Sequence, residues 1–185
     1  MIAGVAATAA EQQASRPGDD LVHRADVVMD RAFTVPAPPE QVWPWLVQLG
    51  KQRAGWYLPA RAERFLPRSR RAARAINQAW LGLRPGAVIP DYGGRRATFE
   101  VAAITAPRSL VYRSRRGRTD VTWSLTLEPA AGPPGHTRVF LRLRMAPVRH
   151  QRLARTAGEL IDLLTVAGMA AGLKERLAAE RRPVS

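Results

Sequence analysis

The chain has 185 residues, 46% of them apolar, and a formal net charge of +14. A chain of this length is expected to form one domain with a sizeable core. The absence of cysteine excludes a disulfide framework, a thiolate metal site and a cysteine nucleophile. The three histidines lie far apart in sequence, so no metal site is expected. The N-terminus lacks the basic leading segment of a secretory signal, which predicts a cytoplasmic protein.

The 29 basic residues are arginine except for Lys51 and Lys174, and they concentrate at residues 61–74, 113–118 and 138–155. This charge can mark an anionic partner such as nucleic acid, acidic lipid or an anionic ligand. It is more typical of a solvated surface encoded by a GC-rich genome, which is the favoured interpretation. No nucleic-acid motif occurs, so specific nucleic-acid binding is not expected, and contact with anionic surfaces is expected to be weak.

Residues 1–20 show no periodicity and predict a flexible N-terminal tail, followed by a single domain over residues 21–185. Residues 26–35 alternate in polarity and predict a strand, which the prolines at 36–39 end. Residues 40–49 then predict a short helix that ends at Gly50. Its apolar face would carry Val42, Trp45, Leu46 and Leu49.

Residues 61–78 are compatible with helix but interrupted by Pro67, which predicts two short helices. Strands follow at hairpin spacing: a short one ending at Pro90, then residues 97–104, 109–114, 120–127 and 137–145. The third of these longer strands alternates strictly and predicts one buried and one wet face. Its buried side would carry Val121, Trp123, Leu125 and Leu127, and its wet side Thr122, Ser124 and Thr126. The strand at 97–104 would share one face among Phe99, Val101 and Ala103, and the strand at 137–145 would turn Val139, Leu141, Leu143 and Met145 inward.

The longest run without proline is residues 149–182, which predicts one long helix. Such a helix is apolar over a wide arc and has to be covered by something large, for which the strands are the candidates. The order of elements therefore predicts an α+β fold in which a curved antiparallel sheet wraps around a long C-terminal helix. The apolar arc would carry Leu153, Ala157, Leu160, Ile161, Leu163, Leu164, Val166, Ala170, Leu173 and Leu177.

Three segments resemble a known family: VPAPPEQVWPWLVQLG at 35–50, RAGWY at 53–57 and GLKERL at 172–177. They are similar to a bacterial branch of the START-like helix-grip superfamily, also called SRPBCC, which includes polyketide cyclase/dehydrase-like and lipid-carrier proteins. The resemblance implies a sheet that grips the last helix, with a deep apolar tunnel between the two. It supplies no fixed catalytic set, and the fold alone does not settle the activity.

Large apolar side chains on the inward face would line such a tunnel, each more often packing than contacting a ligand. Small residues on the last helix, Gly168 and Gly172 among them, either let sheet and helix pack closely or leave room for a guest. Room for a guest is the favoured interpretation, so a larger side chain at position 168 is expected to fill the tunnel. The candidate ligand-binding residues are Trp56, Tyr57, Trp80, Tyr92, Phe99, Arg113, Trp123, Met145, Leu164, Gly168 and Met169.

Polar candidates for chemistry are few. Arg113 could stabilise developing negative charge if its strand register turned it inward, with Val111; the alternative register turns Tyr112 inward. Asp91 beside Tyr92 could act as a general base next to a proton donor, although a turn aspartate ahead of two glycines is the commoner role. Asp162, within the apolar part of the last helix, is expected to be exposed or ion-paired.

These features predict a protein that binds a small hydrophobic or aromatic molecule, lipid-like or polyketide-like, as carrier or sensor. The alternative is a cyclase, aromatase or dehydratase that uses the same cavity without a cofactor. A second alternative is binding to anionic surfaces through the arginines. Either a monomer or a homodimer fits the sequence.

Overall fold

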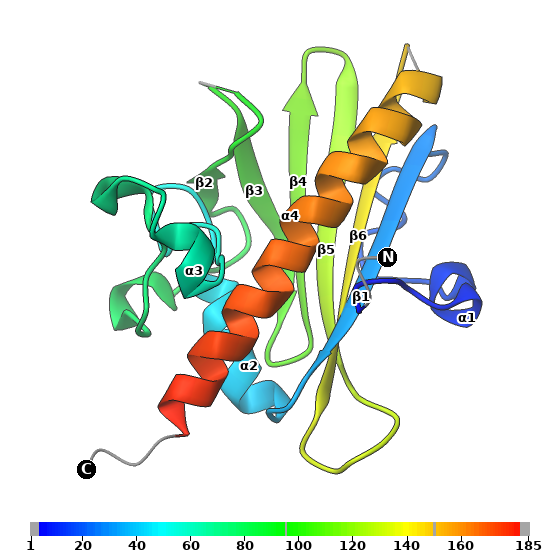
Figure 1. Ribbon diagram of the computed structural model, residues 1–185. Helices are drawn as coiled ribbons and strands as arrows, with labels where there is room; N and C mark the ends of the chain where they lie inside the picture. The colour runs from blue at the N-terminus through cyan, green and yellow to red at the C-terminus, as the bar shows by residue number, and fades with distance from the viewer. Residues whose placement is uncertain (1–3, 95, 150, 182–185) are drawn as a thin grey trace.

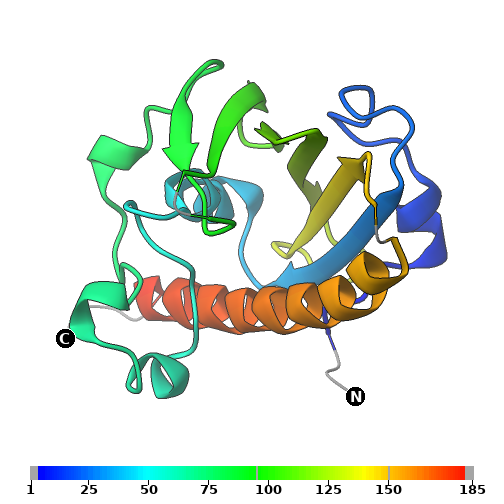
Figure 2. The same ribbon diagram turned by 90° about the horizontal axis from the view of Figure 1, so that it is seen from above.

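In the computed structural model, described over residues 4–94, 96–149 and 151–181 with the backbone alone at 151–157, six antiparallel strands form one sheet. The sheet curves around the long helix α4 (Gln151–Glu180), as Figures 1 and 2 show. The α+β arrangement predicted from the sequence is therefore confirmed. In spatial order the strands are β1 (Val27–Val35), β6 (Thr137–Ala146), β5 (Thr119–Pro129), β4 (Ser109–Arg116), β3 (Thr98–Thr105) and β2 (Val88–Pro90).

Short helices fill the connection between β1 and β2. Helix α2 (Pro39–Gln48) starts at the prolines that end β1 and stops before Gly50, whose φ of 141° favours glycine. The interruption predicted at Pro67 is also present. It separates α3 (Ala60–Glu63) from two short 3-10 helices, η1 (Arg68–Arg70) and η2 (Gln78–Trp80).

The core lies between the concave face of the sheet and the two helices α2 and α4. The predicted apolar face of α2 is fully buried, as are Val121, Leu125 and Leu127 of β5. Among the residues of α4 whose side chains are described, one stripe joins this core through Val166, Met169, Ala170, Leu173 and Leu177, with Leu163 and Ala167 packed beside it.

The opposite side of α4 departs from the prediction of a helix covered over a wide arc. Leu160, Ile161 and Leu164 are 58%, 64% and 52% exposed. The reason is geometric, because a single sheet can cover a helix from one side only. The sequence could not tell this stripe from the buried one, since both are rich in leucine.

A register shift in β3 changes the predicted alternation of that strand. Phe99 and Val101 face the core as expected, but the pairing with β4 shifts between Val101 and Ala103. The irregularity leaves Ala103 exposed and lets Ile104 pack against the core instead.

The N-terminal segment does not match the predicted flexible tail over residues 4–20, whereas residues 1–3 lie outside the described residues. Its helix α1 (Ala9–Gln13) begins with a capping box between Thr8 and Glu11, and Val5 is buried. Outward-facing arginines of β6 hold this segment against the sheet. Arg138 binds the Glu11 carboxylate at 2.7 and 2.9 Å, and Arg142 donates to Asp30, Asp19 and the backbone carbonyls of Ala14 and Gln12.

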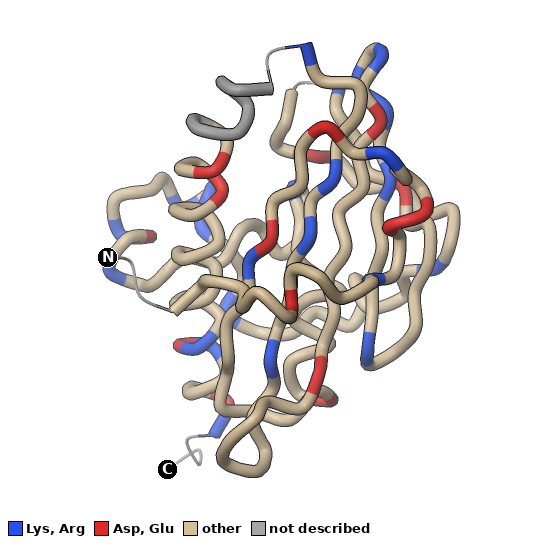
Figure 3. The backbone as a smooth tube through the Cα atoms, turned by 90° about the vertical axis from the view of Figure 1, so that its right-hand side faces the viewer, with Lys and Arg blue, Asp and Glu red and all other residues tan. Residues whose placement is uncertain are grey.

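The convex face of the sheet is consequently less exposed to solvent than its alternation predicts. Thr122, Ser124 and Thr126, the predicted wet side of β5, are all buried. Residues 16–22 cover part of this face: Val22 is buried, and a Cβ added at Gly18 would meet the Val111 side chain. Figure 3 shows basic and acidic residues interspersed over the side of the molecule that carries α1, β1 and β6.

The Glu11–Arg138 pair should make the stability of the protein depend on acid pH. The hydrogen bonds from Arg138 lower the pKa of Glu11 to about 2, against about 4.3 in an unfolded chain. Because the folded pKa is depressed, the pair stabilises the protein above about pH 4.3, and this contribution disappears as the pH falls towards 2. The midpoint of thermal unfolding of Glu11→Gln should therefore lie below that of the wild type at pH 7 and converge with it near pH 2. A difference that is independent of pH would contradict this role.

Candidate functional site

A cavity of about 200 Å³ lies between the concave face of the sheet and α4. Its walls come from β3, β4, β5, β6 and α4, together with the segments that follow α2 and β2. The wall is apolar and aromatic, with three charged side chains. The lining residues are Trp56, Asp91, Gly93, Phe99, Arg116, Val121, Trp123, Leu143, Met145 and Asp162.

Trp123 is the centre of the aromatic wall. Its ring stacks on Tyr112 of the neighbouring strand, with centroids 5.6 Å apart, and on Trp56 at 6.0 Å. The ring centroids of Phe99 and Trp123 are 6.0 Å apart. The indole Nε1 of Trp56 donates a hydrogen bond to the carbonyl oxygen of Thr165 at 3.0 Å, which fixes that ring against α4. A rigid wall of flat rings favours an apolar or aromatic guest.

An ion pair closes one part of the cavity wall. Arg116 donates a hydrogen bond to Asp91 Oδ2, and its guanidinium lies 5.2 Å from the centroid of the Phe99 ring. The other oxygen of Asp91 accepts the backbone N–H of Tyr92 at 2.7 Å. A Cβ at Gly93 would lie 2.8 Å from Asp91 Oδ2, so glycine allows the backbone to pass close to this pair. Asp91 is therefore fully engaged by its neighbours.

Asp162 is the second carboxylate of the cavity. Its Oδ2 lies 2.9 Å from Nε of Arg31, which confirms the prediction of an ion pair or exposure for this residue. Desolvation nevertheless raises the pKa of Asp162; Arg31 opposes the rise, and the nearby carboxylates of Glu159 and Asp30 add to it.

Of the candidate ligand-binding residues, Trp56, Phe99, Trp123 and Met145 line the cavity. Tyr57 and Met169 do not, because both are fully buried in the core. The Tyr57 hydroxyl donates to the Trp45 carbonyl oxygen at 2.8 Å and accepts from Gln48, while burial raises its pKa.

Four further candidates lie away from the cavity. Trp80 packs at the edge of the core, and its carbonyl oxygen accepts a hydrogen bond from Arg53. Tyr92 is 57% exposed and Leu164 points to solvent from α4. Arg113 lies on the convex face, where it bonds Glu100 of β3 at 2.7 Å. The register that turns Tyr112 inward is thus the one adopted, and Asp91, Tyr92 and Arg113 do not converge on one site.

Gly168 and Gly172 allow close packing and do not provide space for a guest. A Cβ at Gly168 would lie 2.7 Å from Leu58 Cδ2, and one at Gly172 would lie 2.7 Å from the backbone N and C of Leu58. The segment before α3 therefore rests directly on α4. A larger side chain at position 168 would meet Leu58 first, contrary to the expectation that it would fill the cavity.

These two contacts predict unequal effects for the same substitution. Alanine favours helix over glycine by about 1 kcal/mol at either position. At Gly168 the obstacle is the end of a flexible side chain, so we expect Gly168→Ala to change the free energy of unfolding by less than about 0.5 kcal/mol. At Gly172 the obstacle is backbone, and we expect a loss of about 1–3 kcal/mol by overpacking. Urea unfolding of both variants measures the difference, and equal effects would contradict the packing described.

Several lining residues were not predicted. Val121 and Leu143 share the inward face with Trp123, Val121 two residues along β5 and Leu143 opposite on β6, so the alternation contained the signal for both. Arg116 belongs to the arginine-rich residues 113–118, for which the sequence favours a solvated surface, and Gly93 is one of the two glycines of the turn expected after Asp91. Nothing in the sequence indicated that Arg116 pairs with Asp91 across 25 residues.

Among the described residues, no helix has the length and hydropathy needed to cross a membrane. Within the same part of the chain, no three acidic or histidine side chains gather in a way that could hold a metal ion.

No protein-family model matches the sequence, and a search of curated proteins finds no significant match. Solved structures do match. A Rhodobacter sphaeroides protein is 17% identical, with a TM-score of 0.55 over 85% of this chain and 95% of its own. XoxI from Bacillus cereus is 10% identical, with a TM-score of 0.53 over 84% and 99% of the two chains. MLL2253 from Mesorhizobium loti is 17% identical, with a TM-score of 0.51 over 84% and 99%. Identities this low show a shared fold alone.

Proposed function

We propose that this helix-grip protein binds one small apolar or aromatic molecule in the cavity under Trp56 and Trp123, as a carrier or sensor. The observation that carries the proposal is the cavity itself, walled by stacked rings whose orientation is fixed from the sheet and from α4. Pockets for drug-sized ligands have volumes of about 300–1,000 Å³. A cavity of about 200 Å³ is smaller, which favours a single ring system or a short chain over a whole lipid.

The charged groups support binding over catalysis. Asp91 is held by Arg116, and Asp162 lies against Arg31. A cofactor-independent cyclase or dehydratase would need a carboxylate or hydroxyl free to move a proton at the substrate. Arg113, the one candidate for stabilising an anion, lies on the other face of the sheet. The paired groups would instead give the guest a polar edge to orient against.

Titration with an apolar aromatic dye tests the proposal. We expect one saturable site per chain and quenching of tryptophan fluorescence, because two of the five tryptophans line the cavity. Native mass spectrometry of the freshly purified protein should give the same stoichiometry for any guest that copurifies. Non-saturable binding, or saturation with no change in tryptophan emission, would contradict a guest in this cavity.

A further inference from the structure

The three arginine-rich segments differ in how many of their arginines form ion pairs. In residues 138–155, three of the four arginines whose side chains are described, Arg138, Arg142 and Arg144, pair with carboxylates of the N-terminal segment and β1. In residues 113–118, three of the four arginines pair with Glu100, Asp120 and Asp91. Six of the eight arginines whose side chains are described in these two groups are therefore paired within the fold.

The third concentration remains largely unpaired. Residues 61–71, which we call the arginine turn, carry five arginines, and all of them are exposed. The only acidic residue of the turn, Glu63, is buried and taken by Arg74 and Arg176. Among the ion pairs of the described residues, none involves an arginine of the turn. These arginines are Arg61, Arg64, Arg68, Arg70 and Arg71.

An exposed aromatic ring stands within this charge. Phe65 is 76% exposed, the highest value among the exposed large apolar residues described, and the Arg64 guanidinium lies 4.6 Å from the centroid of its ring. A single exposed apolar residue needs no explanation by itself. Phe65 differs because it stands among five arginines that form no ion pair with the described residues. An exposed aromatic ring beside basic side chains is typical of a segment that binds a membrane interface.

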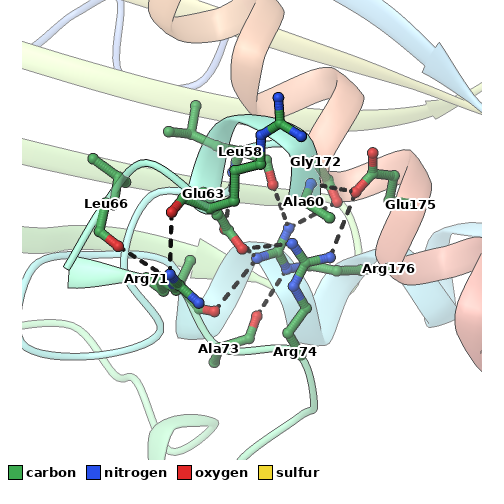
Figure 4. Close-up of polar contacts among 12 residues, drawn as sticks. Leu58, Ala60, Glu63, Leu66, Arg71, Ala73, Arg74, Gly172, Glu175 and Arg176 are labelled. Carbon is green, nitrogen blue, oxygen red and sulfur yellow. Dashed lines mark hydrogen bonds and ion pairs between the residues drawn. The ribbon is translucent and has the colours of Figure 1, made fainter. Parts of the chain in front are cut away.

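The arginine turn is also held in one shape, as Figure 4 shows. Arg71 donates to the carbonyl oxygens of Leu66 at 3.1 Å and Arg64 at 3.2 Å, which closes the turn on itself. Glu63 at its base bonds the buried Arg176 of α4 at 2.8 Å. The ring and the charges are thus presented without the ordering cost that a flexible tail would meet on binding.

We propose that the arginine turn docks this protein on anionic lipid bilayers, with Phe65 entering the boundary between headgroups and acyl chains and the arginines contacting headgroup phosphates. Guanidinium groups bind phosphate oxygens in a bidentate manner, and basic side chains near an anionic bilayer add to affinity. A single-stranded nucleic acid would need successive rings along a basic groove, whereas the turn carries one ring. The proposal goes beyond ligand binding and does not depend on it.

Cosedimentation of the full chain with vesicles at about 0.15 M salt tests the proposal. The wild type should bind vesicles of phosphatidylcholine mixed with phosphatidylserine and not vesicles of phosphatidylcholine alone. Arg68→Glu/Arg70→Glu should weaken binding by at least about 25-fold, since each of the two lost arginines contributes about a fivefold factor and the new carboxylates add repulsion. Phe65→Ala should weaken it about tenfold.

The matched control is Arg108→Glu/Arg118→Glu, which changes the net charge equally at exposed positions of two hairpin turns. It should bind within about threefold of the wild type, because charges beyond a Debye length are screened. Melting curves check that each variant is folded. If Arg68→Glu/Arg70→Glu is not folded, Arg68→Gln/Arg70→Gln takes its place. Equal losses in both pairs, no binding by the wild type, or tighter binding to single-stranded DNA through the same arginines would each overturn the proposal.

Discussion

Replacing Arg176 with leucine is expected to destabilise the protein by about 3–5 kcal/mol, the range for breaking a buried ion pair by removing one partner. The Arg176 guanidinium bonds Glu63 at 2.8 Å and the carbonyl oxygens of Ala73 and Gly172 at 2.8 and 2.9 Å. It also lies 4.6 Å from the centroid of the Tyr57 ring. Figure 4 shows it between α4 and the segment from Leu58 to Arg74. Its loss would leave several buried acceptors without donors.

The effect should depend on pH through Glu63. Burial alone would raise the pKa of Glu63, but hydrogen bonds from Arg176 and Arg74 outweigh burial and place it below its usual value. In the wild type the ionised pair therefore stabilises the fold above about pH 4.3, and this contribution is lost as the pH falls through the depressed pKa. The destabilisation by Arg176→Leu should accordingly shrink in acid.

Urea unfolding at pH 7 and near pH 3 measures both effects, with Lys174→Met as the control because Lys174 is exposed on the same helix. The control should change stability by less than about 0.5 kcal/mol. Adding Glu63→Gln to Arg176→Leu should recover part of the loss, since the buried carboxylate that Arg74 alone would have to neutralise is then absent. If Arg176→Leu lowers the free energy of unfolding by less than about 1 kcal/mol, Arg176 does not hold the segment from Leu58 to Arg74 against α4.

Filling the cavity should remove ligand binding with little effect on the fold. Leu143 lies on β6 directly opposite Trp123 and lines the cavity, so the larger ring of Leu143→Trp would occupy the space of the guest. We expect affinity for the dye to fall at least tenfold, while overpacking costs about 1–3 kcal/mol of stability. Dye titration and urea unfolding on the same samples measure the two quantities.

The same substitution on the far side of α4 is the control. Leu164 is 52% exposed, and Leu164→Trp adds the same ring without reaching the cavity. Its dye affinity should remain within about twofold of the wild type. An equal loss of dye affinity in both variants would indicate a general loss of folding. A loss of dye affinity in Leu164→Trp alone would place the guest beside Leu164, as the sequence predicts.

The fold could be predicted because its main signals are local. Strict alternation from Val121 to Leu127 specifies a sheet with one apolar face, and the proline-free run up to residue 182 specifies the helix that covers it. The predictions that failed concern features that depend on contacts between residues far apart in the sequence. The N-terminal segment is polar and aperiodic by itself, and it becomes ordered because Arg138 and Arg142 of β6 supply ion pairs for it.

The site was only partly predictable for the same reason. Inward alternation identified Trp123 and Met145, and aromatic content identified Trp56 and Phe99, all of which line the cavity. Periodicity could not assign Leu164 to the exposed side of α4, because leucine occupies both sides of that helix. Nor could it distinguish glycines that leave room from Gly168 and Gly172, which lie against Leu58.

The most direct test of a guest in this cavity is an NMR titration that follows the indole N–H signals of the five tryptophans. Trp56 and Trp123 line the cavity, whereas Trp43, Trp45 and Trp80 do not. Adding an apolar aromatic ligand should shift the Trp56 and Trp123 signals to saturation at one equivalent and leave the other three nearly unchanged. Shifts confined to the other tryptophans, or no saturable shift at Trp56 and Trp123, would contradict the proposed site.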